Sequence, residues 1–498
     1  DWLSPQIYGR YWYDKPVFAY WMIALGFKIF GFSEFGARFF PSLFGLGGLW
    51  LTVQAGRKLY REEVGFLSGG LLLMTLEFFT ISKSVLTDGM LFLFMDGALL
   101  CFFLGYSSRE KNWYYGVYIL SALATLTKGP IGFLMPGFII TLFLLYQKDW
   151  KCLKDAKLAA GVPLFLLVAL PWYIAMARVH PDFLGSFLGT QNVLRATVSE
   201  HPRDNVIWYY TAVNLLNAYA WVGFVPGMLW NLLRKNGKWH YPAPREAFLL
   251  LWIFVFFQCM ATKYITYTYP LLLPLCVLTA DYIWKKGSGL ELKWMLLGNI
   301  LFYGALTFAA SKVTKLAPGV FPNPQNLFYF MLLYTLCIAV LAFHKYKGKS
   351  SQEVFSTVVL LTVAFHCCSL DLLAKPLMED VTGKTAAQFI NAVVPEDMPI
   401  YIRGGGYPTS GVFYTGREMV MLVPDAEAEA FKPRKDSWPA KNIMPWTTYG
   451  QVQEQPGKAV VLVDTKTRKL KTKLEEDWPG TWKRVKLPGQ WTVMIKER

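Results

Sequence analysis

The sequence has little charge for its length. Asp, Glu, Lys and Arg make up 17% of its 498 residues, and 54% are hydrophobic. Soluble globular domains carry about 25% charged residues, because they need them to cover their surface. This deficit argues against a soluble protein and favours a chain that spans a membrane.

Two common kinds of site are also missing. None of the seven cysteines falls in a CxxC pair, so the sequence shows neither a disulfide framework nor a cysteine-rich metal site. The glycine run at 404–406 lacks the spacing of a dinucleotide-binding loop and is not followed by a predicted helix. We expect no nucleotide cofactor.

Long apolar runs dominate the chain up to residue 373. Twelve stretches of 16 to 26 residues are long enough to cross a hydrocarbon core of about 30 Å, the shortest with help from flanking residues. The predicted spans are 37–60, 64–82, 86–106, 112–128, 130–147, 158–178, 208–233, 247–262, 265–284, 293–310, 327–343 and 354–373.

Lysine and arginine gather in every second loop between these spans. Loops on the cytoplasmic side of a membrane are enriched in lysine and arginine, which is known as the positive-inside rule. The rule places these basic loops in the cytoplasm and the loops between them on the exterior side. The net charge of +16 therefore indicates orientation and attraction to anionic lipid headgroups, and not nucleic-acid binding. The basic loops are those around 57–61, 109–111, 148–157, 234–245, 285–293 and 345–349.

The opposite, exterior loops carry a few isolated polar groups. Four of these are cations, a pattern that suits a membrane-anchored phosphate, and the tyrosines beside them suit a sugar. The exterior candidates are Asp14, Lys15, Asp88, Lys128, Arg195, His201, Lys263 and Tyr267.

Several of these residues also allow plainer interpretations. Asp88 with Thr87 could simply cap a helix, and Lys128 could extend its amine toward the interface. Glu77 and Asp96 lie at matching depth, where two carboxyls could share a proton or be satisfied by hydroxyls and backbone.

Two regions flank the predicted membrane domain of residues 37–373. Residues 1–36 are expected to form a first periplasmic loop, with an interfacial helix over 17–30. An exterior start implies a preceding span, which would make thirteen. Residues 374–498 are more polar and predict a small periplasmic α/β domain. Its expected helix is 385–393, and its expected strands are 399–403, 412–414, 419–423, 459–463, 481–486 and 491–496.

Several motifs resemble a known family. Their order matches that of bacterial aminoarabinose transferases, integral-membrane glycosyltransferases of the GT-C type related to the protein O-mannosyltransferases. The motifs are Tyr13-Asp14-Lys15-Pro16, Ala37-Arg38-Phe39-x-Pro41-Ser42, Thr87-Asp88, Thr127-Lys128-Gly129-Pro130, Asn192-x-x-Arg195 and Lys263-x-x-x-Tyr267-x-x-Pro270.

The resemblance implies a fold and an activity. Such proteins have thirteen spans and a periplasmic α/β domain, and they move 4-amino-4-deoxy-L-arabinose from undecaprenyl phosphate to lipid A phosphate. The family's acidic Asp-Glu pair, the presumed catalytic acid, would precede Asp1. A divalent metal is implied for some members. Here only Asp14 and His201 could hold one, because Gln191-Asn192 stands where Glu-His is typical.

We therefore expect a polytopic α-helical membrane protein of the bacterial inner membrane that acts as a polyprenyl-phosphate-dependent glycosyltransferase. Asp88 and Lys128 are the expected catalytic residues, and Lys15, Arg195, Lys263 and Tyr267 would bind the lipid phosphate. The acceptor is lipid A or, alternatively, a protein or glycan. A lipid flippase and a non-catalytic lipid-binding subunit are alternatives of another class.

The charge pattern generates a prediction about topology. A periplasm-active reporter, such as alkaline phosphatase, fused after residue 498 should be active. The same reporter placed in the basic loop at 148–157 should be inactive and serves as the control. If the reporter were active in the loop and inactive at the C-terminus, the predicted orientation would be reversed. The cations of the exterior loops would then lie in the cytoplasm.

Overall fold

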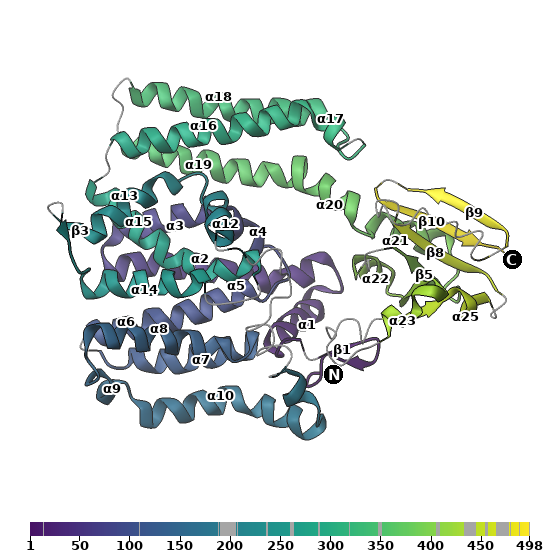
Figure 1. The fold of residues 1–498 in the computed structure, drawn as a ribbon, viewed down its shortest axis with the longest axis horizontal. Helices are drawn as coiled ribbons and strands as arrows, with labels where there is room; N and C mark the ends of the chain where they lie inside the picture. Colours follow the sequence, from purple (N-terminus) through teal and green to yellow (C-terminus); the bar gives the residue numbers. More distant parts are fainter. Residues whose placement is uncertain are drawn as a thin grey trace. The chain divides into compact units, whose positions relative to one another are not determined.

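The computed structural model confirms a polytopic helical fold with a C-terminal sheet domain (Figure 1). It describes residues 1–498 except 13, 109, 188, 190–205, 207, 236–237, 259–262, 287–288, 318, 347–350, 405–408, 433–444, 454–456, 465–477, 479, 488 and 498. Its contacts form two units. One comprises residues 1–5, 13–305 and 332–366; the other comprises residues 6–12, 306–331 and 367–498.

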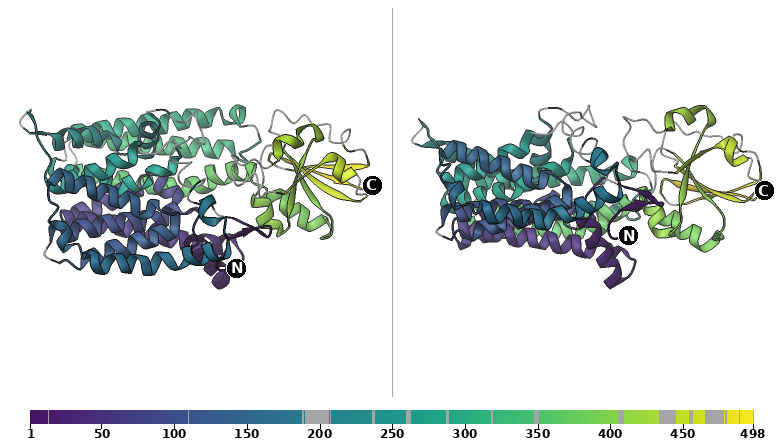
Figure 2. Two further views of the ribbon diagram at one scale, coloured as in Figure 1. Left: turned by 60° about the horizontal axis from the view of Figure 1, so that its bottom comes forward. Right: turned by 90° about the horizontal axis from the view of Figure 1, so that it is seen from below.

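Helices occupy the predicted apolar stretches and run alongside one another within the first unit (Figures 1 and 2). The helices of the N-terminal half are α1 (Phe18–Phe30), α2 (Glu34–Leu59), α3 (Glu62–Leu73), α4 (Leu76–Ile81), α5 (Asp88–Leu91), α6 (Gly97–Ser107), α7 (Trp113–Lys128), α8 (Ile131–Gln147), α9 (Cys152–Asp155) and α10 (Leu158–Val179). A π-helical segment, η1 (Phe92–Asp96), joins α5 to α6.

The later apolar stretches form a second series of helices. They are α12 (Tyr209–Asn217), the 3₁₀ helix η4 (Val222–Phe224), α13 (Val225–Leu233), α14 (Pro244–Gln258), the 3₁₀ helix η5 (Ile265–Leu271), α15 (Leu272–Lys286), α16 (Gly289–Ser311), α17 (Val313–Leu316), α18 (Pro324–Tyr346) and α19 (Ser351–Ser369). A short hairpin, β3 (Arg234–Lys235) and β4 (Lys238–Trp239), follows α13.

Five helices among the described residues are long and apolar enough to cross a membrane, and a sixth if the bent pair around residue 220 counts as one span. The other predicted stretches are helical but shorter, interrupted or more polar. The number of crossings therefore stays a prediction.

Two of the predicted spans are interrupted. The stretch 64–82 breaks at Met74–Thr75, where Thr75 adopts an extended conformation. The stretch 208–233 bends by 117° between α12 and α13. Pro226 lies in the first turn of α13 and has no N–H to continue a helix from the preceding residues. The new helix consequently starts in a different direction.

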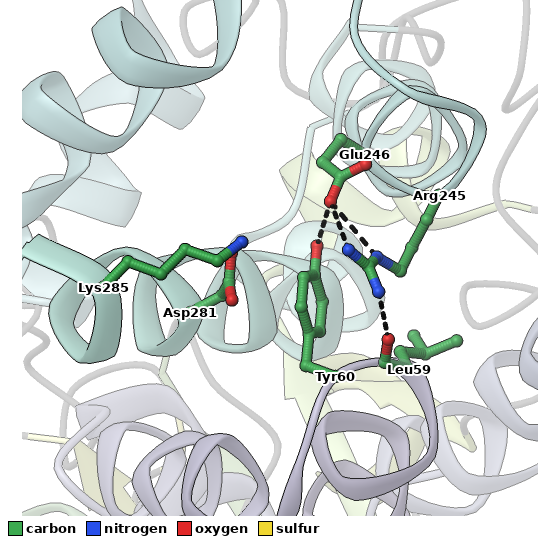
Figure 3. A network of polar contacts seen from close by, with 6 residues as sticks. All are labelled: Leu59, Tyr60, Arg245, Glu246, Asp281 and Lys285. Carbon is green, nitrogen blue, oxygen red and sulfur yellow. Dashed lines mark hydrogen bonds and ion pairs between the residues drawn. The ribbon is translucent and has the colours of Figure 1, made fainter.

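Hydrogen bonds join the ends of α2 and α14 (Figure 3), and Lys285 Nζ of α15 lies 5.4 Å from the centre of the Tyr60 ring. The hydroxyl of Tyr60 donates to Glu246 Oε1 at 3.1 Å, and the Arg245 guanidinium donates to the same oxygen at 2.9 Å. Arg245 also donates to the carbonyl of Leu59. These contacts connect segments that are far apart in sequence. They fix the ends of the helices relative to one another at the end of the bundle that carries the basic loops.

The second unit contains a six-stranded mixed sheet in the order β7-β6-β5-β8-β10-β9. Its parallel strands are β5 (Ile400–Arg403), β6 (Met419–Val423), β7 (Trp446–Thr448) and β8 (Ala459–Asp464). The antiparallel strands β10 (Trp491–Lys496) and β9 (Trp482–Lys486) complete one edge. This unit also holds the hairpin strands β1 (Gln6–Ile7) and β2 (Arg10–Tyr11).

Both faces of this sheet are covered, as expected of an α/β domain. Ile400 and Ile402 pack with α21 (Lys384–Val393) on one face. Tyr401, which alternates with them, packs with Val452 of α25 (Tyr449–Gln453) on the other. The remaining helices are η6 (Leu370–Ala374), α20 (Lys375–Val381), α22 (Thr409–Thr415), η7 (Asp425–Glu427) and α23 (Ala428–Phe431).

The expected strand at 412–414 is wrong, because those residues lie in helix α22, and strand β7 was not predicted. Three residues of high strand propensity are too few to set a period. The Thr415 hydroxyl donates to the carbonyl of Gly411 at 2.8 Å and so satisfies a group at the end of this helix.

Close contact between α7 and α8 generates a prediction about stability. A Cβ on Gly132 would overlap the backbone of Ala124 and Thr125, whereas one on Gly137 of the same helix would meet nothing within 4 Å. Gly132→Ala should therefore cost about 1–3 kcal/mol through overpacking and lower the melting temperature of the purified protein. Gly137→Ala is the matched control and should leave it unchanged or raised. If Gly132→Ala melted at the same temperature as the unchanged protein, α7 and α8 would be able to move apart at no cost in stability.

Candidate active site

A cavity of about 360 Å³ lies where five parts of the first unit meet. It is lined by the segment before α1 and the first turns of α1, by Pro41 of α2, by residues 85–87 with the start of α5, by the end of α7, and by η5 with the residue before it. The polar lining residues are Asp14, Lys15, Tyr20, Thr87, Asp88, Lys128, Tyr264, Thr266 and Tyr267.

The N-terminal segment is fixed to this unit by indole groups. Trp21 Nε1 of α1 donates to the carbonyl of Trp2 at 2.7 Å, and Trp172 Nε1 of α10 donates to the carbonyl of Leu3 at 3.0 Å. The Ser4 hydroxyl is 2.7 Å from His180 Nε2, and both residues are buried. Gly26 of α1 lies against the carbonyl of Gly36, where any side chain would overlap it, so α1 and α2 approach closely. These contacts hold α1 against its neighbours and thereby place Lys15.

An ion pair connects two walls of the cavity. Lys128 Nζ is 2.7 Å from Asp88 Oδ1, and the side chains are only 13% and 9% exposed. Lys128 is the last residue of α7. The helix stops there because Gly129 has a φ of +90°, a conformation that L side chains rarely adopt. The sequence therefore places a lysine amine where the chain turns at the mouth of the cavity.

Asp88 serves this pair and does not cap its helix with a side-chain bond. It lies in the first turn of α5, and Thr87, at the N-cap position, makes no side-chain capping bond. The plainer interpretation of Thr87-Asp88 as an ordinary cap is therefore wrong. The carboxylate of Asp88 instead fixes the amine of Lys128.

Tyr267 provides a second contact for the same amine. Lys128 Nζ lies 4.9 Å from the centre of the Tyr267 ring, within the range of a cation–π interaction. The ring comes from η5, which packs against α5 and η1. Lys128 is thus held from two sides, and its direction into the cavity is set before any ligand arrives.

A second ion pair also lies in the lining. Lys15 Nζ is 3.1 Å from Asp14 Oδ2, with side chains 23% and 21% exposed. The same amine donates to the backbone carbonyl of Asp14 at 3.3 Å. Lys15 is therefore more open to an incoming ligand than Lys128.

The structure brings five of the eight predicted site residues to this cavity: Asp14, Lys15, Asp88, Lys128 and Tyr267. Lys263 is not among the lining residues; it is buried and donates to the carbonyl of Val206 at 2.8 Å. Arg195 and His201 lie outside the described residues. The chemical roles assigned to all eight stay predictions.

Beyond the cavity lies a set of buried polar groups whose partner the sequence did not reveal. Asn217 Nδ2 donates to Glu77 Oε2 at 2.6 Å, across 140 residues of sequence. The other Glu77 oxygen, both oxygens of Asp96 and the hydroxyl of Tyr269 have no hydrogen-bond partner among the described residues. Among the described residues, Ser/Thr hydroxyls and backbone therefore do not satisfy the two carboxyls, and a proton shared between them stays a prediction.

The possible divalent metal at Asp14 and His201 stays a prediction, because His201 lies outside the described residues. The Asp14 carboxylate is engaged by Lys15. Within the described part of the chain, no three His, Cys, Asp or Glu side chains are grouped so as to hold an ion.

The buried ion pair generates a stability prediction. Lys128→Met should cost about 3 kcal/mol, because it leaves Asp88 as a shielded, uncompensated charge. Adding Asp88→Asn to the same chain should recover part of that loss, which melting temperatures of the four variants of the cycle would show. As a control, Arg38→Met, which removes an exposed pair with Glu34, should change stability by less than about 0.5 kcal/mol. Additive losses from the two changes would mean that the pair does not couple.

Known proteins share both sequence and fold with this chain. A family model described as dolichyl-phosphate-mannose-protein mannosyltransferase matches residues 14–174. The undecaprenyl phosphate-alpha-4-amino-4-deoxy-L-arabinose arabinosyl transferase of Shewanella sediminis is 26% identical over 79% of this chain and 72% of its own length. The corresponding Aeromonas salmonicida protein is 28% identical over 64% of this chain and 59% of its own length.

A solved structure shows the same fold over nearly the whole chain. The crystal structure of ArnT from Cupriavidus metallidurans bound to undecaprenyl phosphate superposes with a TM-score of 0.79 at 19% sequence identity. The match covers 99% of this chain and 90% of that one. The chain is thus similar in sequence to these aminoarabinose transferases and has the fold of ArnT.

Proposed function

We propose that this protein transfers 4-amino-4-deoxy-L-arabinose from undecaprenyl phosphate to lipid A phosphate at the periplasmic face of the bacterial inner membrane. The observation that carries the proposal is one cavity holding Lys15, Lys128, Asp88 and Tyr267. The names of the relatives and the undecaprenyl phosphate bound by the Cupriavidus protein support the donor.

The chemistry is a substitution at the anomeric carbon of the sugar. An oxygen of the acceptor phosphate attacks this carbon, and the bond from the carbon to the donor phosphate oxygen breaks. The electron pair of the broken bond stays on the departing phosphate, which gains a negative charge. A phosphate acceptor is already anionic at neutral pH, so its activation requires orientation more than deprotonation.

The two lysines suit the charge that develops on the leaving phosphate. A pre-positioned cation in a partly water-excluded site stabilises such charge without reorganising during the reaction. Lys128 is held by Asp88 and Tyr267, and Lys15 is the more accessible amine. Lys128 would neutralise the departing oxygen, while Lys15 would bind the phosphate on arrival.

Aromatic side chains suit the sugar. Tyr20, Tyr264 and Tyr267 line the same cavity, and their rings offer flat apolar faces with hydroxyls at the edge. No nucleotide sugar is expected as donor, because the periplasm lacks nucleotide pools.

A protein acceptor is the second candidate. The family model that matches residues 14–174 describes a protein mannosyltransferase. The two functions share the donor phosphate and differ in the acceptor. Purified protein supplied with the undecaprenyl-linked sugar should modify lipid A and leave a serine- and threonine-containing peptide unmodified. The reverse outcome would establish the second candidate.

The phosphate role generates a kinetic prediction. Lys15→Ala in the whole protein should lower kcat/KM for the donor by about 100-fold, because one cation is lost from the phosphate. The measurement is modified lipid A formed per unit time, detected by mass spectrometry. Lys28→Ala changes an exposed lysine of α1 that does not line the cavity, and it should retain wild-type transfer. Full activity in Lys15→Ala would show that this amine does not bind the phosphate.

A further inference from the structure

The charges of the described cavity lining balance. Asp14 and Asp88 contribute two carboxylates, and Lys15 and Lys128 contribute two amines. Each amine is already paired, at 3.1 Å and 2.7 Å. An anion that drew both lysines to itself would leave carboxylates uncompensated in a shielded place, which is costly. A ligand that brings both signs would avoid that cost.

The proposed donor brings both signs. Its phosphodiester carries one negative charge, and a primary amine on the sugar is protonated at neutral pH. Such a ligand is a zwitterion with no net charge. It can exchange partners with an existing ion pair, its phosphate taking a lysine and its ammonium taking the carboxylate that the lysine releases.

Asp88 is the better placed of the two carboxylates for this exchange. Its side chain is 9% exposed, compared with 21% for Asp14. Asp14 is the sequence neighbour of Lys15 and also binds that amine through its backbone carbonyl, so the two stay together. Lys128, in contrast, keeps the Tyr267 ring as a second contact when it turns from Asp88 toward a phosphate.

The buried polar residues on the elements that pack near Asp88 also favour a cation. The elements that carry Glu77 (α4), Asp88 (α5) and Asp96 (η1) all pack against η5, which carries Tyr269. Glu77, Asp96 and Tyr269 are at most 3% exposed, and each has an oxygen without a hydrogen-bond partner among the described residues. Several oxygen atoms without partners among the described residues therefore lie on the elements next to Asp88. These oxygens can accept hydrogen bonds from an ammonium, whereas a phosphodiester has no N–H or O–H to donate to them.

We propose that Asp88 is the residue that selects an amino sugar: it releases Lys128 to the donor phosphate and binds the ammonium of the sugar in its place. This inference rests on the proposed function and goes further, because it names the group that distinguishes the donor from a neutral sugar phosphate. Asp88 is then a specificity-determining residue in addition to a partner of Lys128.

The test compares two donors of nearly equal size. One is undecaprenyl phosphate-linked 4-amino-4-deoxyarabinose; the other has a hydroxyl in place of the amine. The wild-type protein should prefer the amino donor by about 100-fold in kcat/KM, the scale expected for one shielded ionic hydrogen bond. Asp88→Asn should reduce that preference to less than about 5-fold, mainly by slowing the amino donor. Asp88→Glu should keep the preference at a lower rate.

The preference is a ratio measured on one preparation, so a partly unfolded variant does not distort it. Asp14→Asn should slow both donors together and leave the ratio unchanged. Asp155→Asn is the matched control on an exposed aspartate away from the cavity, and it should alter neither rate. Equal use of both donors by the wild-type protein, or loss of preference in Asp14→Asn and not in Asp88→Asn, would overturn the inference.

Donor binding separates this inference from the proposed function. The rise in melting temperature on adding each donor measures binding without transfer. If the amino donor stabilises the wild-type protein more strongly, and Asp88→Asn removes the difference, the inference stands even where no sugar reaches lipid A; that failure would overturn only the proposed function. Transfer to lipid A without any donor preference would support the function and refute the role of Asp88.

Discussion

The ion pair between Lys128 and Asp88 is the constraint on which the site depends. A charge at the edge of an apolar bundle is costly unless it is paired, so each residue requires the other. The pair ties the end of α7 to the start of α5 at 2.7 Å. Gly129 ends α7 at that position, and the Tyr267 ring holds the amine from another side. The direction of the amine is consequently part of the fold and need not be acquired when a ligand binds.

Much of the membrane domain could be predicted because its signal is local. An apolar stretch with few charges forms a helix whatever it packs against, so the helices lie where the hydropathy indicates. The bends could not be predicted. The helix α12 ends at Asn217, which binds Glu77 from a helix 140 residues away, and no local pattern reveals such a partner. The helix at 409–415 was missed for a related reason, since its three strand-like residues are too short a signal.

The candidate site was predictable to the extent that it depends on which loop a residue occupies. Charge alternation put Lys15, Asp88, Lys128 and Tyr267 on one side, and the structure collects them around one cavity. Lys263 passed the same criterion, but its buried amine donates to the carbonyl of Val206. Loop position fixes the side of the membrane, not the direction of a side chain. That direction depends on which acceptors the rest of the fold brings near.

The two sides of the bundle use charge for different purposes. On the side with the basic loops, many cations lie in contact with solvent, where each is weakly coupled and their number matters for orientation. The described lining of the cavity carries two lysines, and both are partly shielded and paired. Shielding strengthens every interaction these lysines make, so a few charges suffice, and it also makes an unpaired charge intolerable. A ligand must therefore compensate every charge it displaces, and a neutral pair of opposite charges does so better than a lone anion. Because the site contains few charges and shields them, two lysines are enough to make binding depend on the charges of the ligand.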